Sequence, residues 1–233
     1  MLAAFALAPV SRAGAQELDR IQILSQEQFR LLSEDLAGAL SYRPIIPTTP
    51  LGTTGFDIGL SLTVAKIANS EVLERATSDN APSRIAVPTL RAHKGLPLGF
   101  DIGVLYAHVP NSNIRYFGGE LRYAVFSGGV ATPAVGVRGN FTTVSGIDQL
   151  AFSTRGVDLS VSKGFVVATP YAGIGYLWAK SDPKRNGGLH EEEVGMPKFF
   201  AGMGFNFVLT NFVVEVDRTG EVSALSAKVG LRF

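Results

Sequence analysis

Residues 223–233 read SALSAKVGLRF, and this stretch decides the fold. Every second residue from Leu225 to Phe233 is apolar, and the residues between them are small or charged. Successive side chains of a β-strand point to opposite faces, so the pattern predicts one apolar and one polar face. A strand of about ten residues with these two faces is typical of a segment that crosses a bilayer inside a β-barrel.

The same period of two recurs along most of the chain upstream of this stretch. We expect strands at 54–65, 84–93, 97–109, 113–126, 131–143, 150–162, 165–179, 197–209, 211–218 and 222–233. Most of them have the length that a tilted strand needs to cross a bilayer. The pattern therefore predicts an all-β fold, a closed antiparallel transmembrane β-barrel of about ten strands (between about 8 and 12), with a short N-terminal helix.

Transmembrane helices are the rival membrane interpretation, and the sequence disfavours them. The longest uncharged runs are 164–179 and 199–214, with 16 residues each, against the roughly 20 that a spanning helix needs. The connections favour a barrel as well. Short turns near 93–97, 127–129, 162–165 and 209–211 alternate with longer connections that include 68–83 and 180–196. Bacterial barrels have this asymmetry, with short periplasmic turns and long external loops.

The first 53 residues divide into an export signal and a helix with its linker. Residues 1–15 predict a signal peptide whose true start lies upstream, with an apolar run before the cleavage pattern Ala13-Gly14-Ala15; a buried N-terminal helix is the alternative. In residues 16–53, Ser25 and Gln28 predict a capping box for a helix at 26–40. We expect this helix either as a plug inside the barrel or on its periplasmic face, and the barrel domain at 54–233.

Composition excludes several classes of function. The 233 residues contain no cysteine, so disulfides, thiol catalysis and cysteine-based zinc sites are excluded. Removal of residues 1–15 takes away one of the 21 basic residues, Arg12, and leaves 20 basic and 20 acidic side chains. A chain with a net charge near zero is not expected to bind nucleic acid. We expect no cofactor.

The alternating strands, the terminal Phe233 and the signal site resemble Gram-negative outer-membrane β-barrels. The segment 29–59 is also similar to uncharacterised members of that class. The resemblance covers roughly residues 54–233 and implies a place in the outer membrane of a Gram-negative bacterium. It also implies contacts with membrane lipid and lipopolysaccharide, and a role for Phe233 as the assembly signal that the barrel-assembly machinery reads. It implies no activity.

Alternation also assigns an inward face to the barrel. The charged residues expected there are Asp57, Asp101, Glu120, Arg122, Arg138, Asp158, Glu215, Asp217, Lys228 and Arg232. Their signs are mixed, and an unpaired buried charge is costly. They therefore predict either a paired network that fills the lumen or a polar path for small solutes. A narrow, porin-like pore is the leading hypothesis, and a non-conducting structural or envelope-interaction barrel is the alternative.

A lipid-active enzyme is a third hypothesis, and we expect no catalytic activity. His108 and Ser112 lie near the outer end of a strand, where an esterase acting on lipid would place a base and a nucleophile. No characteristic motif surrounds them, so no catalytic residue is assigned. His190 to Glu193 could offer ligands to a cation, but charge runs in loops are usually solvated, so no metal site is assigned.

Overall fold

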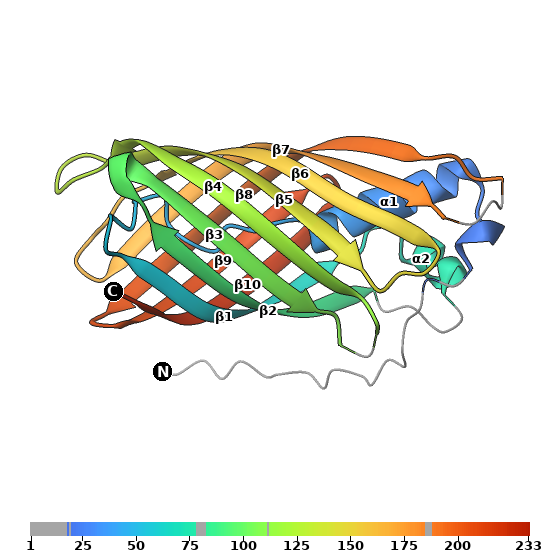
Figure 1. Ribbon diagram of the computed structural model, residues 1–233, viewed down its shortest axis with the longest axis horizontal. Helices are drawn as coiled ribbons and strands as arrows, with labels where there is room; N and C mark the ends of the chain where they lie inside the picture. Colours follow the sequence, from blue (N-terminus) through green and yellow to red (C-terminus); the bar gives the residue numbers. More distant parts are fainter. Residues whose placement is uncertain (1–17, 19, 78–82, 111, 185–187) are drawn as a thin grey trace.

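The computed structural model describes residues 18, 20–77, 83–110, 112–184 and 188–233. Ten antiparallel strands form one closed barrel in which each strand pairs with its neighbour in sequence and β1 pairs with β10 (Figure 1). The strands are β1 (Phe56–Lys66), β2 (Arg84–Gly95), β3 (Phe100–His108), β4 (Arg115–Ser127), β5 (Ala134–Ser145), β6 (Leu150–Ser162), β7 (Ala168–Pro183), β8 (Glu192–Phe207), β9 (Thr210–Thr219) and β10 (Val222–Arg232). The predicted fold is confirmed, and closure leaves no sheet edge exposed.

Two features of the barrel differ from the sequence prediction. The β7–β8 hairpin is longer than expected, because β7 continues to Pro183 and β8 begins at Glu192. The charges at 191–193 and Pro197 obscured the start of β8 in the sequence. The connection between β1 and β2 also contains a short helix, α2 (Ser70–Ala76), which was not expected from the sequence.

The two ends of the barrel are different. The end that carries the C-terminus, here called the turn end, has the connections around 96–99, 128–133, 163–167 and 208–209. At the opposite end, here called the loop end, lie α2 and the tips of the long β7–β8 hairpin. A short 3₁₀ helix, η2 (Pro97–Gly99), forms part of one turn at the turn end.

The N-terminal helix α1 (Gln26–Leu40) lies at the loop end (Figure 1). The predicted capping box is present: the Ser25 side chain accepts from the backbone N–H of Gln28, and the Gln28 side chain accepts from that of Ser25. The helix packs against β7, β8 and β10 and buries most of its apolar residues. Its approach to β10 is close, because a Cβ at Gly38 would lie 2.4 Å from the Cβ of Val222.

After α1 the chain runs through the lumen to the turn end, where β1 begins. Residues 41–51, here called the lumen segment, make this passage. Residues 41–48 are all buried. Before α1, the 3₁₀ helix η1 (Ile21–Ile23) packs beside α2, and the Arg20 amide donates to Ala76 O at 3.1 Å. The described chain therefore enters the barrel from the loop end and begins the first strand at the other end.

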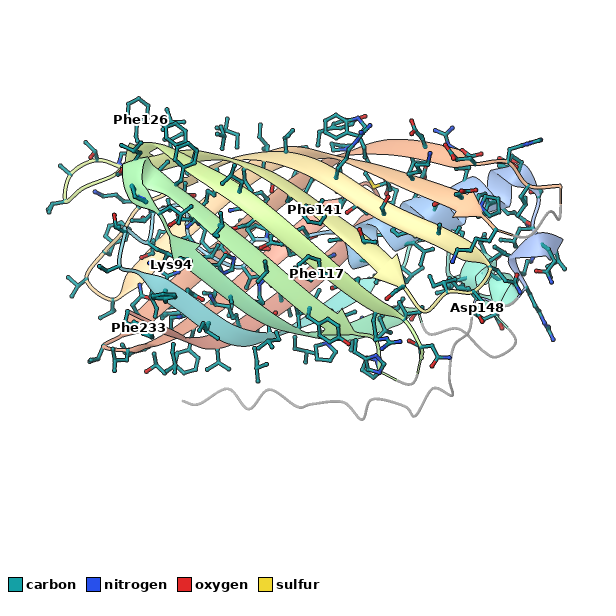
Figure 2. The ribbon with its side chains drawn as sticks, in the orientation of Figure 1. Lys94, Phe117, Phe126, Phe141, Asp148 and Phe233 are labelled. Atoms are coloured by element: carbon teal, nitrogen blue, oxygen red, sulfur yellow. The ribbon has the colours of Figure 1, made fainter. Side chains whose placement is uncertain are left out.

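The outward face of the wall is apolar. Exposed side chains alternate with buried ones on every strand, and Phe117, Phe126 and Phe141 are among the exposed rings (Figure 2). Leu225, Val229 and Leu231 of β10 are about half exposed, at 47–54%. An apolar surface of this extent is far larger than the patches of a soluble protein and matches a lipid environment. Within the described residues, no helix is both long and apolar enough to cross a membrane.

Candidate functional site in the barrel lumen

All ten charged residues predicted for the inward face lie on that face. Nine of them are buried, and the Arg232 side chain is 21% exposed at the turn end. Eight of them separate into three groups along the lumen, each with both signs, and the other two, Glu215 and Asp217, bind the chain that follows α1. Pairing of this kind offsets the cost of removing charges from water.

The first group lies at the turn end. Asp57 accepts from Lys228 Nζ at 2.6 Å and from the Arg232 guanidinium, whose Nη2 is 2.8 Å away. The Asn211 amide donates to the same carboxylate at 3.3 Å. β1, β9 and β10 each contribute to this cluster, so it ties together the strands that close the barrel.

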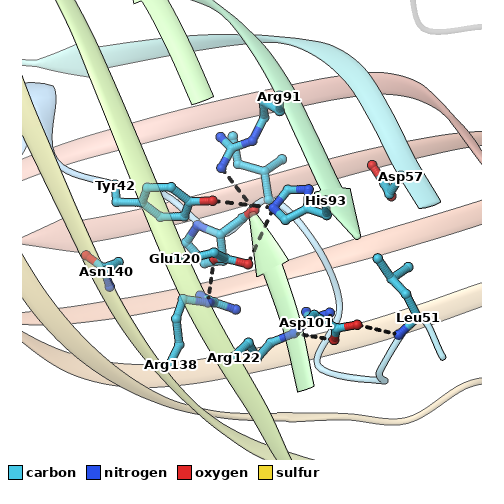
Figure 3. A network of polar contacts seen from close by, with 12 residues as sticks. Tyr42, Leu51, Asp57, Arg91, His93, Asp101, Glu120, Arg122, Arg138 and Asn140 are labelled. Carbon is cyan, nitrogen blue, oxygen red and sulfur yellow. Dashed lines mark hydrogen bonds and ion pairs between the residues drawn. The ribbon is translucent and has the colours of Figure 1, made fainter. Parts of the chain in front are cut away.

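The second group joins the wall to the lumen segment. Arg122 donates to Asp101 through two nitrogens, at 2.6 and 3.1 Å, and its Nη1 donates to Pro47 O at 2.7 Å. The other oxygen of Asp101 accepts from the backbone N–H of Leu51 at 3.0 Å (Figure 3). One ion pair of the wall thus binds two backbone groups of the segment.

The third group lies deeper, around Arg138. Its Nε is 2.8 Å from Glu120, and its Nη1 is 3.3 Å from Asp158. Lys198 Nζ lies 3.5 Å from Asp158 and donates to Tyr42 O at 2.7 Å. Here too, a charged side chain of the wall satisfies a carbonyl of the lumen segment.

His93 completes this group, and Figure 3 shows it between Tyr42 and Glu120. Its Nε2 is 3.4 Å from the Tyr42 hydroxyl and 3.4 Å from Glu120 Oε1. Arg91 lies over the Tyr42 ring at 5.3 Å and donates to the carbonyls of Arg43 and Pro44. These side chains are enclosed between the wall and the lumen segment, so the cluster acts as a packing and hydrogen-bonding core.

Arg43 fastens the end of α1 to the wall. Its Nε donates to Asp217 at 2.7 Å, and its other nitrogens donate to Gly38 O at 2.5 Å and Ala39 O at 3.0 Å. The last carbonyls of a helix have no partner within the helix, so the guanidinium caps them. The same side chain also neutralises a buried carboxylate of β9.

Glu215 and two serines hold the rest of the segment. Glu215 accepts from the Ile45 N–H at 2.9 Å and from the Tyr171 hydroxyl at 2.7 Å. Nearer the turn end, Thr48 donates to Ser160 at 2.9 Å. The backbone N–H of Thr49 donates to the Ser162 hydroxyl at 3.1 Å. Most of these bonds are to backbone atoms, so the wall holds the segment as an extended chain.

Sequence reasoning missed Arg43, Arg91 and Lys198. Arg91 and Lys198 have the parity of inward residues, but their strands were predicted to be shorter than they are. Arg43 lies in a segment that reads as a linker. The signal that could have found it is a charge just after a helix C-terminus, where a cation is favourable.

At the loop end, two side chains of α1 hold the connections. Asp35 accepts from the backbone N–H groups of Ala68 and Asn69, at 3.2 and 2.8 Å. Burial raises the pKa of the Asp35 carboxyl, and these two donors oppose the rise. Gln26 exchanges two hydrogen bonds with the backbone of His190, at 2.9 and 3.1 Å.

The two residues of the enzyme hypothesis, Ser112 and His108, have different surroundings. The Ser112 hydroxyl donates to Val109 O and accepts from the Ile114 N–H, so it stabilises the backbone of its own turn. His108 is exposed on the outward face. Among the described residues, no group of three or more His, Cys, Asp or Glu is arranged to hold a metal ion.

Phe233 pairs with Phe56 through hydrogen bonds of 2.6 and 3.1 Å, beside the seam between β1 and β10. Its role as an assembly signal stays a prediction. The predicted export signal lies outside the described residues.

No protein-family model matches the chain, and no curated protein matches it. Among solved structures, the chain is similar to the N-terminal β-barrel domain of OprF from Pseudomonas aeruginosa, with 12% identity over 78% of this chain and 99% of that one, at a TM-score of 0.35. It is similar to the KdgM porin with 11% identity over 76% and 99%, at 0.41. It is also similar to Ail of Yersinia pestis, with 13% identity over 77% and 97%, at 0.28. These likenesses are general in kind, and the closed antiparallel barrel itself follows from the strand pairing of this chain.

Proposed function

We propose that this protein is an outer-membrane barrel of a Gram-negative bacterium that is closed to solutes. In this proposal it holds its own N-terminal segment through the lumen and serves as a structural or envelope-interaction protein at the cell surface. The observation that carries the proposal is the complete burial of residues 41–48 inside the barrel. A segment of this kind fills the space that a solute would need.

The contacts of the lumen segment support a lasting arrangement. Backbone groups from Tyr42 to Leu51 are bound by charged or hydroxyl side chains of the wall. Removal of the segment would take a hydrogen-bond partner from each of those side chains, and a buried polar group without its partner is costly. The mixed charges of the lumen thus act as partners of the segment.

The size of the barrel supports the proposal as well. Barrels of about eight strands are filled by their own side chains, whereas those of sixteen or more leave an aqueous channel. Ten strands lie close to the filled limit. The space left beyond the wall's own side chains suits one extended chain.

Planar-bilayer conductance of the refolded chain tests the proposal, with folding checked by heat-dependent gel mobility. We expect no steady conductance from the full chain, and conductance after deletion of residues 16–51, which removes α1 together with the whole lumen segment. Steady conductance in the full chain would overturn the proposal. If neither protein conducts, the barrel is closed and the side chains of the wall themselves block the lumen.

A cysteine pair tests the position of the lumen segment in the membrane. The chain has no cysteine, so the variant Thr48→Cys with Ser160→Cys has a clean background. The two hydroxyls lie 2.9 Å apart, and we expect oxidation to link the two positions in the folded protein. Thr48→Cys with Ser226→Cys is the control, because Ser226 is inward but bonds to Thr63. Equal cross-linking in both variants would contradict the threaded arrangement.

A narrow pore is the second candidate function, and one observation favours it. Every described contact between the lumen segment and the wall is non-covalent, and the wall behind it is polar. Release of the segment would expose a charged path. Conductance that begins in the full chain only under an applied voltage or load would support this candidate over a permanently closed barrel.

A further inference from the structure

The outward face of the wall carries a row of basic residues at the loop end. Lys66 is the last residue of β1 and lies directly opposite Arg84 of β2. On its other side Lys66 lies opposite Ser223 of β10, which in turn lies opposite Arg218 of β9. All four side chains are exposed. We call these four residues the basic row; they cross four adjacent strands, or about 14 Å at the usual strand spacing.

The charges of this row are poorly compensated. Like charges directly opposite each other on neighbouring strands are destabilising. Among the residues that the structure describes, no carboxylate forms an ion pair with Lys66 or Arg84. Arg218 is paired with Glu221 at 2.7 Å, but both side chains are more than half exposed. An exposed pair of this kind is weak enough for a stronger anion to replace it.

On another part of the rim, a basic side chain does have acidic partners from the chain itself. Lys180 of β7 forms an ion pair with Glu191 at 2.7 Å, and it lies directly opposite Glu193. Both acids come from the chain itself. Lys66 and Arg84 therefore differ from Lys180, because neither has an ion-pair partner among the described residues.

An apolar groove lies directly beside the row, toward the middle of the wall. It has a volume of about 780 Å³, and its lining includes Val64, Phe199, Val216 and Leu225 together with the row. Phe199, Val216 and Leu225 are 47–55% exposed. These residues belong to the apolar outward face, so the groove opens toward the hydrocarbon of the membrane and the row lies at its polar boundary.

We propose that the basic row binds the phosphate of a phosphorylated lipid in the outer leaflet, with an acyl chain of the same molecule in the apolar groove. Lys and Arg at a membrane boundary reach toward headgroups while their stems cover apolar surface. A phosphate would supply the negative charge that the opposed Lys66 and Arg84 lack. A lipid fits better than a free anion, because charge and apolar groove adjoin on the face that contacts the bilayer.

The proposal rests on the membrane location in the proposed function, but not on a closed lumen. Its test uses the full chain, refolded in non-ionic detergent and checked by heat-dependent gel mobility. Binding of purified lipopolysaccharide is measured beside binding of its dephosphorylated form. The test variant is Lys66→Gln with Arg84→Gln. The control is Arg155→Gln with Lys180→Gln, which removes two exposed charges from β6 and β7.

We expect the control to bind the phosphorylated lipid as the parent does, and the test variant to bind it at least tenfold more weakly, since each basic residue near a lipid surface contributes substantially. Ser223→Glu, which places a carboxylate inside the row, should weaken binding as well. All five substituted positions are exposed, so each variant should still fold. The dephosphorylated lipid should bind weakly to every variant.

Three outcomes would overturn the proposal. Equal weakening in the test and control variants would mean non-specific attraction by net charge. Equal binding of the dephosphorylated lipid would mean adsorption of acyl chains alone. Competition by inorganic phosphate at the same concentration as the lipid would mean a simple anion site. Conductance of the full chain would refute the closed barrel and leave this lipid test unaffected, so the two failures are distinguishable.

Discussion

Replacement of Arg43 by alanine should release the end of α1 from the wall. The Arg43 side chain is only 3% exposed and its partner Asp217 is fully buried. Loss of the guanidinium leaves a buried carboxylate without its cation, which typically costs about 3–5 kcal/mol. It also leaves the carbonyls of Gly38 and Ala39 without their donor. A cost of this size changes the equilibrium between the folded and released states by roughly 10²–10⁴-fold.

Urea titration of the refolded protein measures this cost through the fluorescence of Trp178. This residue is the only tryptophan and lies on the outward face. Arg30→Ala is the matched control, because the Arg30–Glu34 pair belongs to the same helix but is 58% and 37% exposed. Such pairs contribute about 0.3–0.5 kcal/mol.

The loss of stability in Asp217→Asn should lie between those of Arg43→Ala and Arg30→Ala. This variant removes the negative charge but leaves Arg43 bonded to the helix carbonyls. If Arg43→Ala unfolds at the same urea concentration as Arg30→Ala, the claim that Arg43 anchors the helix is wrong.

Two further perturbations test the packing and the pairing inside the barrel. Gly38→Leu should prevent α1 from packing against β10, because even a Cβ there would lie 2.4 Å from Val222. Protease treatment should then cleave the N-terminal segment. Gly139→Leu, where nothing lies within 4 Å of the added Cβ, should leave that segment protected. Asp57→Asn keeps the shape of the side chain but leaves two cations around a neutral amide, so the gel-mobility transition should move to lower temperature by an amount equivalent to about 3 kcal/mol. Asp148→Asn, at an exposed position, should leave that transition unchanged.

The inward charges could be predicted from the sequence because a period of two is a local property. Once a strand is recognised, alternation assigns each of its side chains to the inward or the outward face. Arg122 and Arg138 were found in this way. The ion-pair partners could not be predicted, because they depend on register and closure. Asp57 and Lys228 are 171 positions apart, and only the pairing of the first strand with the last brings them together.

The lumen segment was harder to predict for a different reason. Residues 44–53 are rich in Pro, Thr and Gly, a composition that predicts an exposed linker. Burial of such a segment requires partners for its backbone groups, and those partners are spread over several distant strands. Arg122 bonds to Pro47 O, and Glu215 bonds to the N–H of Ile45. The helix boundaries and its capping box, in contrast, depend on neighbours three or four positions away, and both were predicted.

The charged lumen that suggests a pore is also what makes a threaded segment stable. An extended chain inside a barrel has no strand partners there, so its N–H and C=O groups need donors and acceptors from the wall. Ionised side chains form the strongest such bonds, and Arg91, Lys198 and Glu215 each bind the segment in this way. A count of inward charges therefore does not separate a pore from a filled barrel. The distinguishing evidence is which atoms those charges bind, and in this barrel they bind the backbone of the protein's own N-terminal segment.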